Sequence, residues 1–379
     1  MASLTTESLL KIYSEKLLDA CTNDKETIDV QALLLKLAKV INSKAQLKRI
    51  LLNFSKDTSS ELRKLAFDFF IDINELPKLV LQVKATEYFE QRYPGSSVVF
   101  SEKLNGVQLG SIAEVTSIIG KKIRFYIKTH RKGLLSQFSS TAKPVDLTEI
   151  FLYKFLEKIG FGPEVHFFYS NPEEFYICTR DAGDIDSQSN MSFMTFSNFI
   201  DSDATKQIVE RVRSMDPCNE TIDYDTDKFM LAIVEIDILC RLFDMHDVLK
   251  NADNFGFILN SNRIERFSII DFSPTSYGLC GDEIYKGFIE GNGVFLHHRN
   301  NEPALKYILC SRSIDKRREL GQRAFQQMGD LRIHVITIFE FLKLLVQNDE
   351  ELSAQLLGIE RKTQNWLQAI DQFRELLQK

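Results

Sequence analysis

The chain has 379 residues, of which 44% are hydrophobic and 26% charged, a composition typical of a folded globular protein with room for more than one domain. Phenylalanine is abundant, at 29 residues, whereas glycine and proline are sparse, which excludes a disordered or fibrous chain. The formal net charge of −6 is modest, and the sequence contains no run of lysine and arginine that could bind along a nucleic-acid phosphate backbone. We therefore expect no nucleic-acid partner.

We expect neither a targeting segment nor a membrane-spanning segment in this sequence. Residues 1–16 lack the basic region followed by an apolar run that marks a signal peptide. The most apolar helical stretch, residues 335–346, is interrupted by Glu340 and Lys343 and is too short to cross a bilayer. We therefore expect a cytoplasmic protein without a membrane partner, in which the six scattered cysteines are reduced and structural.

The first 95 residues are predicted to be helical. Apolar residues recur there at steps of three and four, as in Leu47, Ile50, Leu51 and Phe54, and Pro94-Gly95 ends the pattern. The charged positions between these apolar stripes suggest a surface for a protein partner. Packing of this helical domain on the neighbouring part of the chain is the alternative.

Strands and then helices follow. Residues 97–130 alternate and are rich in Val, Ile, Phe and Tyr, which predicts three antiparallel strands. A helix is predicted at 146–160, and two more strands at 164–170 and 174–180. Residues 227–243 are apolar almost all round, which predicts a core helix, and charged helices fill the chain from about residue 315. The predicted fold class is therefore α+β.

Three features of the strand region fit a nucleotide-phosphate site. Lys128 lies in an apolar strand, where a lone charge is costly unless it is paired, and Glu149 in the next helix could be its partner. Gly106 and Gly110 precede Lys128 and could let backbone amides approach phosphates. Taken singly, each has an ordinary structural explanation: an edge-strand lysine, an acid that favours a helix N-terminus, and glycines of a turn.

This order of a glycine-containing hairpin, a strand lysine and a helix glutamate resembles the protein-kinase-like superfamily. The stretch "GFGPEVHFF" (160–168) is similar to the choline kinase and aminoglycoside phosphotransferase branch. The resemblance implies a two-lobed fold, in which the segment 175–184, including Thr179, leads into the hinge that holds the adenine of ATP. The implied domains are a helical domain (1–95), a small lobe (96–185), a large lobe (186–310) and a helical extension (311–379).

The resemblance also assigns roles to the stretches 243–259 and 266–274. It implies that Asn254 and Asp271 bind Mg²⁺, because each borders an apolar run and supplies an oxygen ligand. The family places the catalytic Asp five positions before the Asn, but Leu249 stands there. Asp247, seven positions before Asn254, is the better candidate, and Asp253 is the other acid within reach.

Two functions are compatible with these residues. The first is a Mg-ATP-dependent phosphotransferase that uses Lys128, Glu149 and Asp247, with a protein or a small molecule as acceptor. The second is a pseudokinase that serves as a nucleotide-binding or protein-interaction module, which the displaced Asp247 favours. An ordinary α/β core with a polar turn and an aspartate that caps a strand is the structural alternative for residues 246–271.

Overall fold

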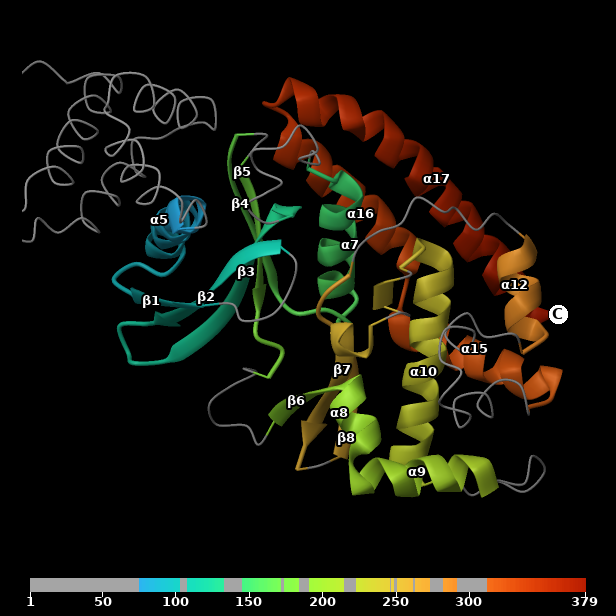
Figure 1. Cartoon of the computed structure of the whole chain (residues 1–379). Helices are drawn as coiled ribbons and strands as arrows, with labels where there is room; N and C mark the ends of the chain where they lie inside the picture. Colours follow the sequence, from blue (N-terminus) through green and yellow to red (C-terminus); the bar gives the residue numbers. More distant parts are fainter. Residues whose placement is uncertain are drawn as a thin grey trace, which may run out of the picture. The chain divides into compact units, whose positions relative to one another are not determined.

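The computed structural model describes residues 75–102, 108–132, 145–171, 174–183, 191–214, 223–245, 247–248, 251–261, 263–272, 282–291 and 312–379. These residues form a mixed fold of helices and antiparallel strands, which confirms the predicted α+β class. Most of the predicted N-terminal helical domain lies outside them. The chain divides into two compact units (Figure 1), of which the first holds the described residues up to Asp146 with His166–Thr179, and the second holds Leu147–Val165 with those from Arg180 onward.

A five-stranded sheet forms the centre of the first unit, and its strand order is β1-β2-β3-β5-β4. The first three strands pair antiparallel, as the alternating pattern predicts. The elements are α5 (Glu75–Arg92), β1 (Ser97–Glu102), β2 (Gln108–Thr116), β3 (Lys122–Lys132), β4 (Val165–Asn171) and β5 (Glu174–Arg180).

Helix α5 packs on one face of this sheet because the strands alternate. The buried residues of β2 and β3 that meet the helix are every second residue, such as Phe125 and Ile127. They pack with Leu81, Ala85 and Phe89 of α5. Lys128 follows Ile127 directly, so its side chain leaves the strand on the face opposite α5.

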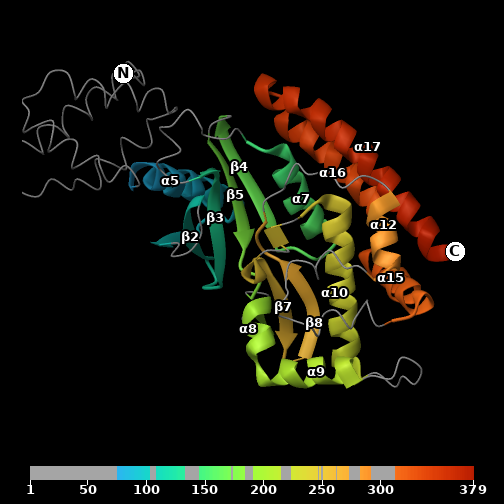
Figure 2. The same ribbon diagram turned by 45° about the vertical axis from the view of Figure 1, so that its right-hand side comes forward.

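The second unit is built from helices around a three-stranded sheet of order β6-β7-β8. Figure 2 shows helix α10 beside strands β7 and β8. The elements are α7 (Leu147–Lys158), β6 (Met191–Thr195), α8 (Phe196–Asp201), α9 (Asp203–Ser214), α10 (Tyr224–Phe243), the 3₁₀ turn η1 (Ala252–Asn254), β7 (Phe255–Asn260), β8 (Arg263–Ile269), α12 (Asp282–Ile289), α15 (Ile314–Met328), α16 (Leu331–Val346) and α17 (Glu350–Gln378).

Helix α10 is the predicted core helix, and every residue from Phe229 to Phe243 is buried. It begins at Asp223, whose side chain accepts a hydrogen bond from the Thr226 amide, and ends at Asp244 in the left-handed conformation. A helix without an exposed face must bury its polar side chains as well. Asp237 and Arg241 therefore pair inside the unit, with 2.6 Å between Oδ2 and Nε.

The C-terminal helices pack on α7. Helices α16 and α17 run side by side in both views (Figures 1 and 2), and the Trp366 ring of α17 lies 4.7 Å from the Phe151 ring of α7. Lys362 of α17 also donates a hydrogen bond to the Thr148 hydroxyl, at 2.8 Å. Helix α7, which the sequence analysis groups with the small lobe, thus belongs to the second unit.

Two observations concern the expected absence of a membrane-spanning helix and the expected structural role of the cysteines. None of the described helices has both the length and the apolar character needed to cross a membrane. Cys178 and Cys240 are buried free thiols, and burial raises the pKa of Cys240 well above its usual value. A buried protonated thiol is a poor nucleophile, which agrees with a structural role for Cys240.

Candidate functional site

Three of the predicted site residues, Asp247, Asn254 and Asp271, meet in the second unit. The Asn254 amide nitrogen donates to Oδ2 of Asp247 at 3.1 Å. The Asn254 backbone carbonyl accepts from the amides of Ile270, at 2.8 Å, and Asp271, at 3.1 Å. Asn254 is buried, so it is the central residue of this group.

The pairing of β7 with β8 explains why Asn254 and Asp271 meet. The two strands are antiparallel, and Phe255 at the start of β7 lies opposite Ile269 at the end of β8. Residues just before one strand and just after its antiparallel neighbour lie at the same end of the ladder. The two apolar runs of the sequence thus determine that Asn254 and Asp271 are neighbours.

The loop between Asp247 and Asn254 is closed by its own hydrogen bonds. The Asn251 amide donates to the Asp247 carbonyl at 3.0 Å, so the chain turns back on itself. The Asn251 side chain caps η1 by accepting from the Asp253 amide at 3.1 Å, and it donates to Oδ1 of Asn254 at 2.9 Å. Asp247 thus lies within hydrogen-bond distance of Asn254, seven residues further along the chain.

Asp271 is oriented by helix α7. Its Oδ1 accepts from the Tyr153 hydroxyl at 2.9 Å and from the Phe272 amide at 3.0 Å. The rings of Tyr153 and Phe272 also pack together, with centroids 4.3 Å apart. We call Tyr153, Asp247, Asn251, Asn254 and Asp271 the Asn254 network.

The Asn254 network contains oxygen atoms of the kind that Mg²⁺ prefers. Asp271 has a carboxylate, and Oδ1 of Asn254 keeps a second lone pair beside its bond from Asn251. Among the residues that the structure describes, no group of three or more His, Cys, Asp or Glu could hold a metal ion. A cation at this place would therefore take water or phosphate oxygens beside its protein ligands, as Mg²⁺ commonly does.

The other described nucleotide candidates lie in the first unit. Lys128 is 7% exposed and lies opposite Gly110 of β2, next to a bulge in the pairing of the two strands. Thr179 of β5 is also buried, and its hydroxyl donates to the Tyr126 carbonyl of β3 at 3.4 Å. The sheet thus brings Gly110 and Lys128 together, as a phosphate site on this hairpin requires.

Glu149 lies in the first turn of α7 in the second unit and is 4% exposed. Lys128 belongs to the first unit, so the ion pair predicted between Lys128 and Glu149 stays a prediction. Gly106 lies outside the described residues. Asp253, the alternative acid, is exposed, and its backbone amide bonds to Asn251.

Sequence reasoning missed two members of the Asn254 network, Asn251 and Tyr153. Asn251 had a readable signal, because an Asn just before a short turn commonly caps it. Tyr153 had a weaker one: it stands four residues after Glu149 and so shares a helix face with a predicted site residue. Its bond to Asp271 joins segments far apart in the chain and could not be read from spacing.

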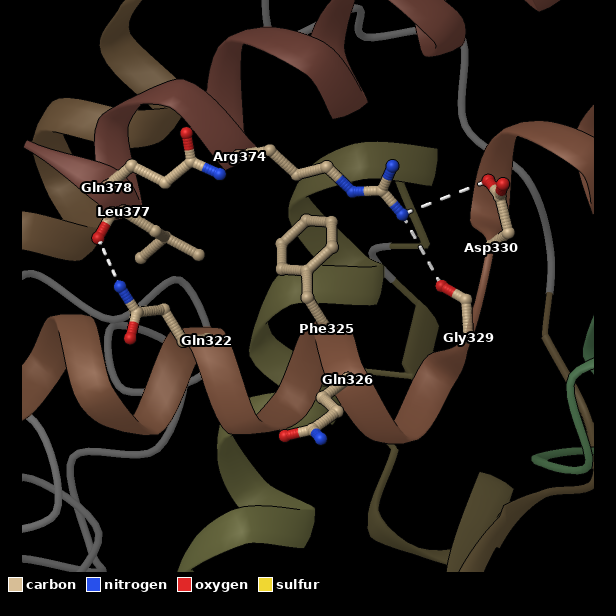
Figure 3. A pocket seen from close by; sticks show the side chains of 8 residues that line it. All are labelled: Gln322, Phe325, Gln326, Gly329, Asp330, Arg374, Leu377 and Gln378. Atoms are coloured by element: carbon tan, nitrogen blue, oxygen red, sulfur yellow. Dashed lines mark hydrogen bonds and ion pairs between the residues drawn. The ribbon is translucent and has the colours of Figure 1, made fainter.

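A cavity of about 370 Å³ lies elsewhere in the second unit, between α15 and the end of α17 (Figure 3). The guanidinium of Arg374 lies over the Phe325 ring at 5.7 Å and contacts Asp330 at 3.8 Å. At the other end, the Gln322 side chain donates to the Leu377 carbonyl at 2.7 Å. No residue of the Asn254 network lines this cavity.

Comparison with known protein families and with curated proteins gives no relative of this chain. No protein family matches the chain, and no curated protein matches its sequence.

Proposed function

We propose that the chain is a Mg-ATP-dependent phosphotransferase of the protein-kinase-like kind, with a protein or a small molecule as acceptor. The observation that carries this proposal is the Asn254 network, in which Asp247, Asn254 and Asp271 are linked despite the lengthened loop. A second observation adds support: the buried Lys128 lies on the third strand of its sheet, the strand that holds the phosphate-binding lysine of protein kinases.

Each residue has a distinct role in the proposed reaction. Asp247, which is partly exposed, orients the acceptor hydroxyl and takes its proton during transfer. Lys128 offsets the negative charge of the phosphates, and Gly110 opposite it leaves room for a phosphate oxygen near the strand. Glu149 is the proposed partner that orients Lys128.

Asn254 and Asp271 are the residues that would hold Mg²⁺, which would supply positive charge to offset that of the phosphates. Hydrogen bonds to neighbouring groups hold both residues in place. The Asn254 carbonyl is tied to the end of β8, and Tyr153 fixes one carboxylate oxygen of Asp271. Such preorganisation lowers the free-energy cost of arranging ligands around an ion.

One observation favours the pseudokinase alternative. Oδ2 of Asp247 accepts a hydrogen bond from the Asn254 amide, so the proposed base and a proposed metal ligand are bonded to each other. Asp247 must keep its other oxygen for the acceptor or exchange this bond during the reaction. A chain that never makes this exchange would bind nucleotide without turning it over.

The first experiment measures nucleotide binding by thermal unfolding of the full chain with ATP, with and without Mg²⁺. A ligand that binds only the folded state stabilises it by about 2.7 kcal/mol at a hundredfold excess over Kd. We expect a shift that depends on Mg²⁺, and Asp271→Asn should remove that dependence. The absence of any ATP-induced shift in the wild type would contradict both the kinase and the nucleotide-binding pseudokinase.

The second experiment measures ATP turnover by the wild type, Asp247→Asn and the matched control Asp253→Asn. General-base assistance contributes about 10²–10⁴ in rate, so we expect Asp247→Asn to lose this factor while Asp253→Asn stays close to wild type. Loss confined to Asp253→Asn would assign the base to Asp253 instead. Mg-dependent binding without turnover in any of the three proteins would establish the pseudokinase.

A further inference from the structure

The turn between β2 and β3 exposes two neighbouring isoleucines. In this hairpin tip (residues 117–121), Ile118 is 77% exposed and Ile119 is 88% exposed. They are the two most exposed large hydrophobic side chains among the residues that the structure describes. The hairpin tip belongs to the first unit.

The backbone of the hairpin tip is fixed by hydrogen bonds. The Gly120 amide donates to the Ser117 carbonyl at 2.8 Å, and the Ser117 amide donates to the Lys121 carbonyl at 2.8 Å. The Ser117 hydroxyl also accepts from the Lys121 amide at 3.0 Å. Gly120 has a φ of +78°, a conformation that glycine adopts without strain. The two isoleucines are therefore held outward by a well-defined turn.

Neither the turn nor the solvent favours isoleucine at these two positions. Tight turns are rich in Gly, Pro, Asn, Asp and Ser, whose side chains or backbone freedom suit them, whereas β-branched residues prefer strands. Exposure of an aliphatic side chain to water is also unfavourable in free energy. Part of Ile118 rests on Gly95, where an added Cβ would lie 2.8 Å from its Cδ1, but Ile119 has no comparable cover. A pair of such residues at one tip indicates a contact with another apolar medium.

The residues that follow the tip are basic. Lys121 ends the hairpin tip, Lys122 and Arg124 lie at the start of β3, and Glu114 on β2 lies opposite Arg124. Lys122 pairs with Glu114 at 2.7 Å, and this bond, together with the charges of Lys122 and Arg124, lowers the pKa of Glu114. The apolar tip is therefore followed in the chain by three basic residues.

The size and shape of this feature decide between a protein and a lipid partner. A specific protein interface usually buries about 1,200–2,000 Å², and the side chains of a single hairpin tip supply only a small part of that area. A bilayer surface makes no such demand, because a convex apolar tip can enter the headgroup region alone. Nearby lysines and arginines then gain from the negative potential of anionic lipids.

We propose that the hairpin tip docks the protein reversibly on an anionic lipid surface, with Ile118 and Ile119 inserted and Lys121, Lys122 and Arg124 at the headgroups. This proposal departs from the expectation of no membrane partner, which was based on segments that could span a bilayer. The proposed contact needs no such helix, and none of the described helices could span a membrane. Two aliphatic side chains and a few charges give a weak, salt-sensitive attachment.

The first test is sedimentation of the full chain with vesicles of phosphatidylcholine alone or with about 30% phosphatidylserine. We expect binding to the anionic vesicles that weakens as salt rises. Ile118→Ser with Ile119→Ser should lower the partition coefficient by about 10- to 100-fold, given the transfer free energy of two aliphatic side chains. The matched control is Leu344→Ser with Leu357→Ser, which removes two exposed leucines of α16 and α17, 68% and 67% exposed, and should leave binding unchanged.

A second readout reports insertion directly. The chain has a single tryptophan, and Trp366 is buried at 8% exposure, so Ile119→Trp adds one exposed reporter. We expect its emission to shift to the blue when anionic vesicles are added. The proposal would be overturned if the wild type bound neither type of vesicle. It would also be overturned if the Ile118→Ser, Ile119→Ser double variant bound anionic vesicles as well as the wild type does. Self-association lost in the serine pair, without lipid binding, would also overturn it and assign the tip to a protein contact.

Discussion

The interior of α10 and the Asn254 network bury polar groups in two different ways. In α10 the buried carboxylate of Asp237 is matched by the guanidinium of Arg241, and the two side chains are 1% and 2% exposed. In the Asn254 network the carboxylates accept hydrogen bonds from neutral donors, namely the Asn254 amide, the Tyr153 hydroxyl and the Phe272 amide. The Asp237 carboxylate is thus paired with a cation, and hydrogen bonds fix the direction of the carboxylates of Asp247 and Asp271.

This difference is the one expected between a structural role of α10 and the proposed chemical role of the Asn254 network. An opposite charge stabilises a carboxylate but makes it a poor ligand for a further cation. Neutral donors fix the direction of a carboxylate without cancelling its charge, as a metal-binding or proton-accepting group requires. The comparison predicts that changes in α10 act on stability, whereas changes in the Asn254 network act on ligand binding.

Arg241→Ala is expected to have the largest effect. It leaves the Asp237 carboxylate buried without its guanidinium, and the loss of one partner of a buried pair costs about 3–5 kcal/mol of unfolding free energy. Chemical denaturation measures this cost. Replacement of both residues by leucine should recover much of it, because no lone charge remains.

A matched pair on the surface serves as the control for Arg241→Ala. Lys286 and Glu290 in the region of α12 have the same spacing of four residues but lie 3.8 Å apart, with side chains 75% and 48% exposed. Lys286→Ala should change the unfolding free energy by less than about 1 kcal/mol. If Arg241→Ala and Lys286→Ala lowered the unfolding free energy equally, burial would not determine the cost of breaking an ion pair. The contrast between α10 and the Asn254 network would then lose support.

Glu235→Gln tests a second buried acid of α10, which has no direct ion pair of the kind that joins Asp237 and Arg241 among the described residues. Glu235 is 3% exposed, and no hydrogen bond to its Oε1 is present among the described residues. Burial raises its pKa from 4.5 to about 8, against the opposing charges of Lys228 and Arg323. The folded state therefore holds a proton on Glu235 that the unfolded state releases above its own pKa of 4.5.

The sign of the pH dependence follows from this raised pKa. The stability linked to Glu235 is complete below pH 4.5 and is lost as the pH rises toward about 8. Between pH 5 and pH 8 the wild type should lose about 3 kcal/mol that Glu235→Gln does not lose. Denaturation curves across this range measure the difference. The exposed acid Glu360 provides the control, and identical pH profiles for Glu235→Gln and Glu360→Gln would contradict the prediction.

Much of the fold could be predicted from the local pattern of apolar and polar residues. Alternating residues predicted β1, β2 and β3, and helical periodicity predicted α7, α10 and the helices of the C-terminal part. The two apolar runs around Asn254 and Asp271 became the antiparallel strands β7 and β8, whose pairing makes these residues neighbours. Each of these features depends on residues that are close in sequence.

Contacts between distant segments could not be predicted in the same way. Trp366 packs on Phe151 of α7, and this contact places α7 among the C-terminal helices. Nothing in the α7 sequence tells which of several apolar surfaces it meets, because helix packing depends on the shape of both partners. The same limit applies to Tyr153, whose hydroxyl reaches Asp271 only because α7 lies where tertiary packing puts it.

Tyr153→Phe is the smallest change and the sharpest test of the comparison. It removes only the hydroxyl that orients Asp271, so the site loses one hydrogen bond to a carboxylate while the ring contact with Phe272 remains. We expect the Mg-dependent part of the ATP affinity to fall by roughly tenfold, or about 1.5 kcal/mol, as measured by Mg²⁺ titration at fixed ATP. Tyr88→Phe is the matched control, since it removes a hydroxyl that bonds to Nδ1 of His166 at 2.9 Å in the first unit. Both variants should lose a similar, small amount of stability, but only Tyr153→Phe should change the Mg²⁺ dependence. If the two variants behaved alike in the Mg²⁺ titration, the Tyr153 hydroxyl would have a structural role only, and the neutral donors of the Asn254 network would not serve to orient a metal ligand.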